Sequence, residues 1–157
     1  MDYEDRLLDK LDAMSLGFPV YPDVNASVSS ISVAALPGST TVRTYYDDVV
    51  DKEYIHEIKI KARETERQLA VAALMKAGQE LDKTTDIESE DDSFDFGGIT
   101  VTNELFFSEA TTEGWMFFTL QIKSLLTVWE KEEEENGEPE DPDETEEPGE
   151  PVENNGG

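Results

Sequence analysis

The distribution of large apolar residues along the chain limits where a folded core can form. All fourteen aromatic residues lie between Tyr3 and Trp129, and Val152 is the only large apolar residue beyond that point. A core must therefore come from residues 1–129, a length that suits one domain. Residues 130–157 combine fourteen acids with four prolines and one lysine, a composition that cannot offset the entropy lost on ordering. We predict one domain over residues 1–129 and a disordered acidic tail over residues 130–157.

The formal net charge of −26 divides equally between these two parts. Residues 1–129 hold 24 acids and 11 bases, while residues 130–157 hold 14 acids and one base, so each part carries −13. Proteins that bind nucleic acid neutralise phosphates with Lys and Arg, and anionic membrane surfaces attract the same residues. We therefore expect no direct sequence-specific nucleic-acid binding and no membrane contact. A negative charge would, however, suit the wall of a channel that DNA passes through without binding.

Cysteine is absent, which excludes disulfides, thiol nucleophiles and thiolate metal sites. Residues 1–5 lack both the basic and the apolar region of a secretory signal, and no apolar run is long enough to span a bilayer. These features predict synthesis in a reducing cytoplasm.

The first half of the chain changes from helical to strand periodicity. Residues 3–16 predict a helix with Asp2 as its N-cap and Gly17 at its C-terminal stop. Two prolines make residues 18–22 an extended edge or a loop. The apolar stripe of the helix comprises Leu7, Leu8, Leu11 and Met14, and strands are expected over residues 28–36 (ended by Pro37-Gly38), 41–50 and 53–62.

The second half repeats this order. Residues 64–83 predict the longest helix, because good helix formers fill the segment and no proline interrupts it. Residues 86–93 are interpreted as an exposed acidic loop. Strands are then expected over residues 94–101 (with a bulge at Gly97-Gly98), 105–108 and 115–129, the last with Phe118, Leu120, Ile122, Leu126 and Val128 on its apolar side.

The connections between the predicted strands are short, which favours antiparallel pairing. Helices segregated against such a sheet form an α+β layer packing. The expected fold class is therefore α+β, with an antiparallel or mixed β-sheet packed against two main α-helices.

Side chains that could carry chemistry are isolated along the sequence. His56 is the only histidine, and we interpret it as a half-buried strand residue, because metal or charge-relay chemistry usually needs a second such group. Asp47, Asp48 and Asp51 lack the residue spacing of an EF-hand loop, as do residues 86–92. Both clusters are interpreted as solvated turns, with a weak divalent-ion site as the alternative. No nucleotide-binding or nucleophile motif occurs, so we expect no catalytic residue, cofactor or metal.

Basic and aromatic residues suggest where copies of the chain would meet. Seven of the twelve bases lie between Lys52 and Lys83. They form either a solvated strand end and helix start, or a patch that pairs with an acidic face of a neighbouring copy. Aromatic residues at strand ends either complete a core or lie at an interface. The candidate subunit-interface residues are Tyr45, Tyr46, Lys59, Lys61, Arg67 and Phe106.

A series of short segments runs in a fixed order through residues 3–129. The early ones are Leu36-Pro37-Gly38-Ser39, residues 42–47, Lys52-Glu53-Tyr54 and His56-Glu57-Ile58. The later ones are Ser93-Phe94-Asp95-Phe96 and residues 99–103, 113–118, 120–123 and 126–128. In these segments the chain resembles the phage minor capsid protein family of Gram-positive hosts.

This resemblance implies the tail-terminator fold of long-tailed bacteriophages, an α+β domain that forms a hexameric ring. Such a ring caps the finished tail tube, stops polymerisation of the tube protein, and offers a docking surface for the neck of the head. The implied partners are other copies of the chain, the tail tube protein and a neck or head-completion protein. The implied location is the virion. The acidic tail after Trp129 receives no role from the resemblance.

Two alternatives stay open at this point. The chain could be a neck or head-completion adaptor, since the family is named for minor capsid proteins. It could also be a small acidic binding protein that uses residues 130–157 to mimic nucleic acid, rather than for solubility and spacing.

Overall fold

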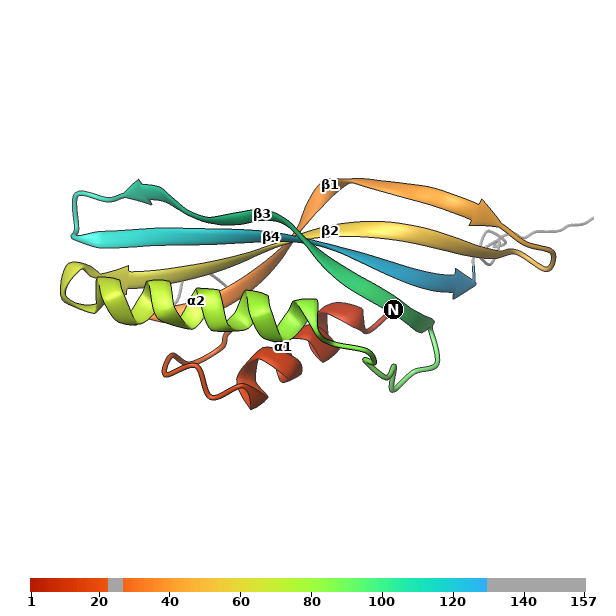
Figure 1. The fold of residues 1–157 in the computed structure, drawn as a ribbon, viewed down its shortest axis with the longest axis horizontal. Coiled ribbons are helices and arrows are strands. Elements are labelled where there is room, and N and C mark those ends of the chain that lie inside the picture. Colours follow the sequence, from red (N-terminus) through yellow and green to blue (C-terminus); the bar gives the residue numbers. More distant parts are fainter. Residues whose placement is uncertain (23–26, 130–157) are drawn as a thin grey trace, which may run out of the picture.

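The computed structural model describes residues 1–22 and 27–129, without the side chain of Glu104. These residues form two α-helices, one short 3-10 helix and a single β-sheet (Figure 1). The acidic tail predicted over residues 130–157 lies outside the described residues. In chain order the elements are α1 (Tyr3–Ala13), β1 (Ser30–Thr44), β2 (Val49–Arg63), η1 (Glu64–Glu66), α2 (Arg67–Asp82), β3 (Phe94–Ala110) and β4 (Trp115–Trp129).

The strands pair in the order β1-β2-β4-β3, and every neighbouring pair is antiparallel. The shorter strands have 15 residues, so the sheet is about 50 Å long at the usual rise per residue. Both α-helices cover the same face of this sheet (Figure 1). The predicted α+β class is thereby confirmed, with an antiparallel sheet.

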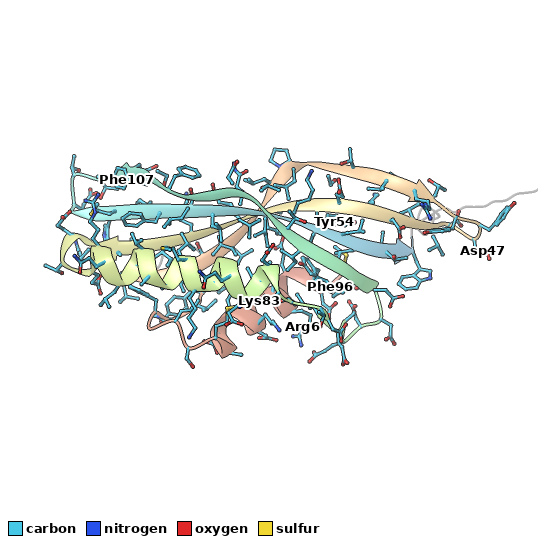
Figure 2. The ribbon with its side chains drawn as sticks, viewed as in Figure 1. Arg6, Asp47, Tyr54, Lys83, Phe96 and Phe107 are labelled. Atoms are coloured by element: carbon cyan, nitrogen blue, oxygen red, sulfur yellow. The ribbon has the colours of Figure 1, made fainter. Side chains whose placement is uncertain are left out.

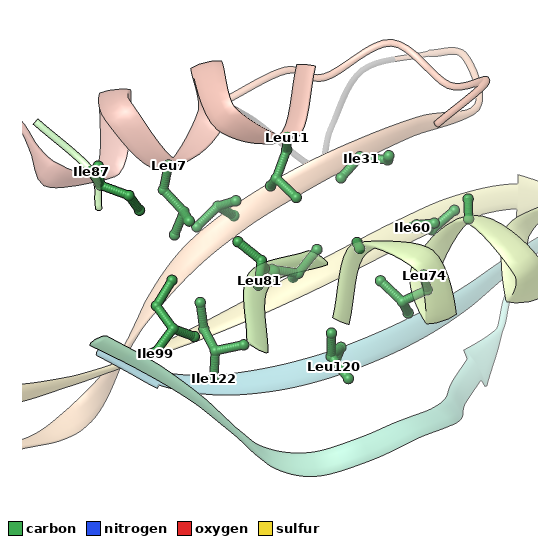
Figure 3. Close-up of a cluster of buried hydrophobic side chains, with 14 of the residues drawn as sticks. Leu7, Leu11, Ile31, Ile60, Leu74, Leu81, Ile87, Ile99, Leu120 and Ile122 are labelled. Atoms are coloured by element: carbon green, nitrogen blue, oxygen red, sulfur yellow. The ribbon is translucent and has the colours of Figure 1, made fainter. Parts of the chain in front are cut away.

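The core lies between the two helices and the face of the sheet that they cover (Figure 3). Alternation along β4 turns Leu120 and Ile122 toward the helices, as predicted, and both are buried. The predicted small and apolar face of α2 is also buried, which lets this helix lie close to the sheet. Large side chains with no measurable exposure include Leu7 and Leu11 of α1, Ile31 of β1, Ile58 and Ile60 of β2, and Leu81 of α2.

Two strands, rather than the predicted three, precede α2. Pro37 and Gly38 do not end a strand, because they lie inside β1 where its register with β2 shifts. An edge strand tolerates proline at such an irregularity, and glycine adopts the φ of +113° found at Gly38. The turn between β1 and β2 falls at residues 45–48, so the predicted strand over residues 41–50 spans it.

α1 begins at Tyr3 with Asp2 at the N-cap position, as predicted, but its side-chain cap and its C-terminal end need correction. The Asp2 carboxylate makes no cap hydrogen bond to the helix, and instead accepts hydrogen bonds of 2.8 Å from the Ser89 hydroxyl and the Glu90 N–H. The acids of residues 86–92 are exposed, as predicted, and these hydrogen bonds join their loop to the start of the chain. Ser15, with φ of 55°, reaches the left-handed region before Gly17 does, so α1 ends earlier than predicted.

Two strands also follow α2, where three were expected. The predicted strands over residues 94–101 and 105–108 are parts of one irregular strand, β3. One of its register shifts falls at Gly97-Gly98, which confirms the predicted bulge. β4 has the predicted bounds.

Residues 18–22 follow the extended prediction. The Tyr21 N–H donates to the Ile31 carbonyl, and the Ile31 N–H donates to the Pro19 carbonyl, so this segment lies against the first part of β1. Among the described residues, no helix combines the length and apolar character needed to cross a membrane.

Candidate functional site

The sheet face turned away from the helices, here the open face, carries cations stacked on aromatic rings. Lys59 Nζ lies 5.5 Å from the centre of the Phe117 ring, and Lys61 Nζ lies 4.4 Å from that of Trp115. The Arg63 guanidinium lies 3.7 Å from the same Trp115 ring. These five residues form the basic–aromatic cluster.

The register between β2 and β4 brings this cluster together. Lys61 pairs with Phe117 and Arg63 pairs with Trp115 across the two strands, so cations and rings share one face. Arg63 also donates from Nη1 to the Glu113 carbonyl at 2.7 Å. Arg63 is exposed, whereas Lys61 is buried, and a cation–π contact contributes about 0.5–1 kcal/mol at an exposed site and about 2 kcal/mol when desolvated. The rings therefore hold the cationic groups in place without neutralising their charge.

Phe106 belongs to the same half of the open face. Thr119 of β4 pairs with Lys59 on one side and with Phe106 on the other. Thr119 is fully buried, whereas Phe106 is 42% exposed. Of the predicted interface residues, the structure thus gathers Lys59, Lys61 and Phe106.

Tyr45 and Tyr46 lie at the far end of the sheet, in the turn between β1 and β2. Asp47 and Asp48 close this turn with φ of 63° and 61°, a conformation that aspartate tolerates. The Tyr46 side chain is 91% exposed, and Tyr45 is 44% exposed. Neither residue completes the core. The Tyr45 hydroxyl donates to the Asp51 carboxylate at 2.9 Å, which fixes its position beside the turn.

Arg67 lies on a different element from the other predicted basic residues. It is the first residue of α2, in the helix layer, and its guanidinium lies 3.9 Å from the Glu64 carboxylate. Both side chains are more than half exposed, so this ion pair contributes little to stability. The chain turns from β2 into η1 between Lys61 and Arg67, so Arg67 belongs to the helix layer and not to the strand that carries Lys59 and Lys61.

A groove of about 580 Å³ separates α2 from β3. Beside it, Met75 of α2 is 52% exposed and lies at the border of the buried face of this helix. Phe107 of β3 is 47% exposed and contacts the Phe118 ring edge-on, with ring centres 5.6 Å apart. The side chains that line this α2–β3 groove are those of Leu74, Met75, Gly78, Gln79, Asp82, Val101, Leu105 and Leu120.

His56 is buried, with 3% exposure, rather than half-buried as predicted. It faces the helices, where its ring centre lies 5.5 Å from that of Tyr3 and its Nε2 lies 3.4 Å from the Glu4 carboxylate. Burial lowers the pKa of His56 below its ordinary value, and the nearby Glu4 charge opposes part of that effect. His56 is more buried than predicted because α1 packs onto β2 at this position. The alternation of residues along the strand does not reveal which helix covers His56.

In both acidic clusters, a carboxylate accepts hydrogen bonds from neighbouring groups of the protein. Thr127 and Tyr45 donate to the Asp51 carboxylate and lower its pKa. Ser93 and Ser89 donate to Asp91 and lower the pKa of that carboxyl. Within residues 1–22 and 27–129, no group of three or more His, Asp or Glu side chains is placed to hold a metal ion.

The sequence prediction missed Trp115, Phe117 and Phe107 as surface residues. Trp115 and Phe117 occupy alternate positions of β4, opposite its apolar side, and that alternation was the available signal. Phe107 gives no such signal, because the register shifts of β3 decide which way its side chain points.

No protein-family model matches the sequence, and no curated protein matches it. The class of molecule is therefore defined by the described fold. It is a two-layer α+β protein with a four-stranded antiparallel sheet, two helices on one face and a basic–aromatic cluster on the other.

Proposed function

We propose that this chain is a structural protein that assembles head to tail with copies of itself. The observation that carries the proposal is the placement of exposed aromatic residues at opposite ends of the sheet. Tyr45 and Tyr46 lie at the β1–β2 turn, here the turn end, beside Asp47 (Figure 2). Phe107 lies at the other end, here the groove end, beyond the α2–β3 groove (Figure 2).

Two different surfaces at opposite ends favour a heterologous contact, in which the turn end of one copy meets the groove end of the next. Such contacts produce a ring when the rotation between neighbours closes, and a filament when it does not. A single self-complementary patch would instead give a two-fold symmetric dimer. The distribution of exposed aromatics thus favours a ring or a filament over a two-fold dimer.

The edges of the sheet support the same arrangement. The first part of β1 is covered by residues 19–21. The second part of β1 is exposed on both sides from Thr40 to Thr44, and β3 forms the other edge of the sheet. Unpaired strand edges are templates for pairing with another chain.

The ring we propose ends the tail tube of a long-tailed bacteriophage and joins it to the head or neck. The segments that resemble the phage minor capsid protein family support this role, and they extend over both ends of the sheet. The charge of −13 on residues 1–129 supports it too, because a negative lumen passes DNA without retaining it.

The test combines light scattering with negative-stain imaging of the full chain. We expect rings, with Tyr46→Asp and Phe107→Asp each shifting the protein to monomer, because each places a charge in a contact whose aromatic anchors contribute on the order of 2 kcal/mol or more. Tyr21→Asp is the matched control, since Tyr21 is exposed beside the covered part of β1. A chain that stays monomeric alone and with purified tail tube protein would contradict the proposal.

A further inference from the structure

Tyr46 is the most exposed aromatic residue among those that the structure describes. It is 91% exposed, whereas the next most exposed aromatic residue, Phe107, is 47% exposed. The turn that carries Tyr46 is held in place, because Tyr45 and Thr127 both donate hydrogen bonds to the Asp51 carboxylate. A tyrosine in a fixed position loses little conformational entropy on binding, and such residues are typical anchors that enter a pocket on a partner.

The α2–β3 groove is an apolar cavity of a size that suits such an anchor. Its volume of about 580 Å³ lies within the range of about 300–1,000 Å³ that is usual for binding pockets. Leu74 and Leu120 contribute buried walls. Gly78 lies one helical turn from Leu74 and one from Asp82, and it has no side chain to fill the space between them. At the border, Met75 supplies a flexible thioether, which packs favourably against aromatic rings.

The polar residues of the groove suit the hydroxyl of a tyrosine. Gln79 and Asp82 are three positions apart on α2, so they share one side of the helix, and both are exposed. A tyrosine that is buried on binding needs a partner for its hydroxyl. The Gln79 amide or the Asp82 carboxylate can accept that hydrogen bond while the ring lies against the apolar walls.

We propose that the α2–β3 groove is the binding site for Tyr46 of the next copy of this chain. The inference rests on the head-to-tail assembly proposed above, and it names the side chain and the cavity through which that assembly forms. A copy cannot fill its own groove with Tyr46. Leu120 of the groove pairs with Ile58, which is nine positions along β2 from Val49 at the turn end, a separation of about 30 Å.

Exposed apolar residues around Tyr46 and around the groove enlarge this contact. With about 150–250 Å² for a complete aromatic side chain, their exposed fractions sum to on the order of 700 Å². A standard interface buries about 1,600 Å² in total, so these side chains would provide roughly half of one. They are Val42, Tyr45, Tyr46 and Trp129 at the turn end, and Met75, Phe106 and Phe107 at the groove end.

The acidic segment of the chain does not suit the groove as an occupant. Residues 130–157 contain fourteen acids and a single large apolar residue, Val152, whereas the groove is lined mainly by apolar side chains. A segment of the tail tube protein is the other alternative. We therefore assign the groove to a second copy, with the tube protein as an outcome of the test.

The first test uses the full chain with p-benzoylphenylalanine in place of Tyr46. This photoreactive side chain keeps an aromatic ring at the turn and reacts readily with methionine. Mixing isotopically heavy and light chains identifies the cross-links that join two copies. We expect such links to Met75 and Leu105, which line the groove. The same replacement at Tyr21 is the matched control and should give no link to the groove. Links from position 46 that avoid the groove would overturn the proposal.

A double-mutant cycle tests the same contact without a label. Tyr46→Ala should weaken self-association by about thirtyfold, and Met75→Ala by about fivefold. The double variant should be no weaker than Tyr46→Ala alone, because Met75 has then already lost its partner. Leu69→Ala is the matched control, since Leu69 is 66% exposed on the same helix and does not line the groove. Losses that add fully for Tyr46→Ala and Met75→Ala would overturn the proposal.

The response to salt separates this apolar contact from one made by opposite charges. Each copy has a net charge of −26, and Asp47 and Asp48 beside Tyr46 would approach Asp82 in the groove. Salt screens this repulsion, so self-association should tighten by about three- to tenfold between about 0.05 M and about 0.5 M sodium chloride. Association that weakens over this range would overturn the proposal.

Failure of this inference can be distinguished from failure of the ring. Rings whose cross-links from position 46 lie outside the groove would contradict insertion of Tyr46 alone. Groove cross-links within filaments that never close would contradict the ring alone. If purified tail tube protein protects Met75 from oxidation by peroxide while position 46 gives no link to the groove, the groove belongs to that partner and the inference is overturned.

Discussion

Tyr3 and Ser124 are 121 positions apart in the sequence and are joined by a buried hydrogen bond of 2.6 Å from Tyr3 Oη to Ser124 Oγ. The Tyr3 ring also meets Phe94 edge-on, with ring centres 5.2 Å apart. Burial raises the pKa of Tyr3 to about 12, so its hydroxyl remains a protonated donor at any physiological pH. The first residue of α1 is thereby fastened to the middle of β4.

Tyr3→Phe should lower the free energy of unfolding by about 1–2 kcal/mol, because it leaves the Ser124 hydroxyl buried without this partner. Urea unfolding measures the change. Adding Ser124→Ala to Tyr3→Phe should recover part of the loss, since the orphaned hydroxyl is then gone. Tyr21→Phe, at an exposed tyrosine, is the control and should stay within about 0.5 kcal/mol of the parent. Equal stability of Tyr3→Phe and the parent would show that the bond contributes nothing.

His56 should make the fold less stable below neutral pH. Because burial lowers its pKa in the folded state, the unfolded chain binds the His56 proton more readily. Stability is then full above the unfolded pKa of about 6.5 and declines as the pH falls from there toward the folded pKa. His56→Gln should flatten the dependence of the melting temperature on pH between about 7.5 and 5.5. Parallel curves for parent and variant would contradict this assignment.

Asp51 connects the turn end to β4, because its carboxylate accepts hydrogen bonds from both Tyr45 and Thr127. These bonds lower its pKa, so its contribution to stability is present above the unfolded pKa of about 3.9 and is lost as the pH falls below it. Asp51→Asn should speed amide hydrogen exchange at residues 45–51 and weaken self-association at neutral pH. Asp95→Asn, on the exposed part of β3, is the control. Unchanged exchange at the turn would contradict the role of Asp51.

Gly78 allows α2 to approach the sheet. A Cβ at this position would lie 3.2 Å from Leu120 Cδ2, and Leu120 is buried. At an exposed helical position Gly→Ala stabilises by about 1 kcal/mol, but overpacking a filled core costs about 1–3 kcal/mol. Gly78→Ala should therefore lower the free energy of unfolding in the parent and raise it in a Leu120→Val background. If Gly78→Ala stabilised the parent, the Leu120 side chain would have to move away from the new methyl group without strain, which would contradict this account.

The accuracy of the strand predictions depended on how regular each strand is. Uninterrupted alternation from Trp115 to Trp129 predicted β4 with its observed bounds. β1 was divided wrongly, since Pro37-Gly38 usually marks a turn and its edge position is a property of the folded sheet. The true turn at residues 45–48 is made by two aspartates in the left-handed region, a signal weaker than Pro-Gly.

The candidate surface was predicted only in part, for a related reason. Lys59, Lys61 and Phe106 were named from their residue types, and the structure places them on one half of the open face. The pairing of these cations with the Trp115 and Phe117 rings could not be predicted, because more than fifty residues separate β2 from β4 and the sequence does not reveal the register between them. Exposure of Tyr46 likewise follows from the position of the turn, which the sequence misplaced.

The most direct test of head-to-tail assembly mixes two variants that each lack one surface. Tyr46→Asp alone and Phe107→Asp alone should both be monomers of 17.6 kDa by light scattering. When mixed, the intact turn end of the second variant meets the intact groove end of the first. We predict a dimer of about 35 kDa, twice the chain mass, that grows no further. A mixture that stays at the monomer mass, or single variants that assemble as the parent does, would contradict the account.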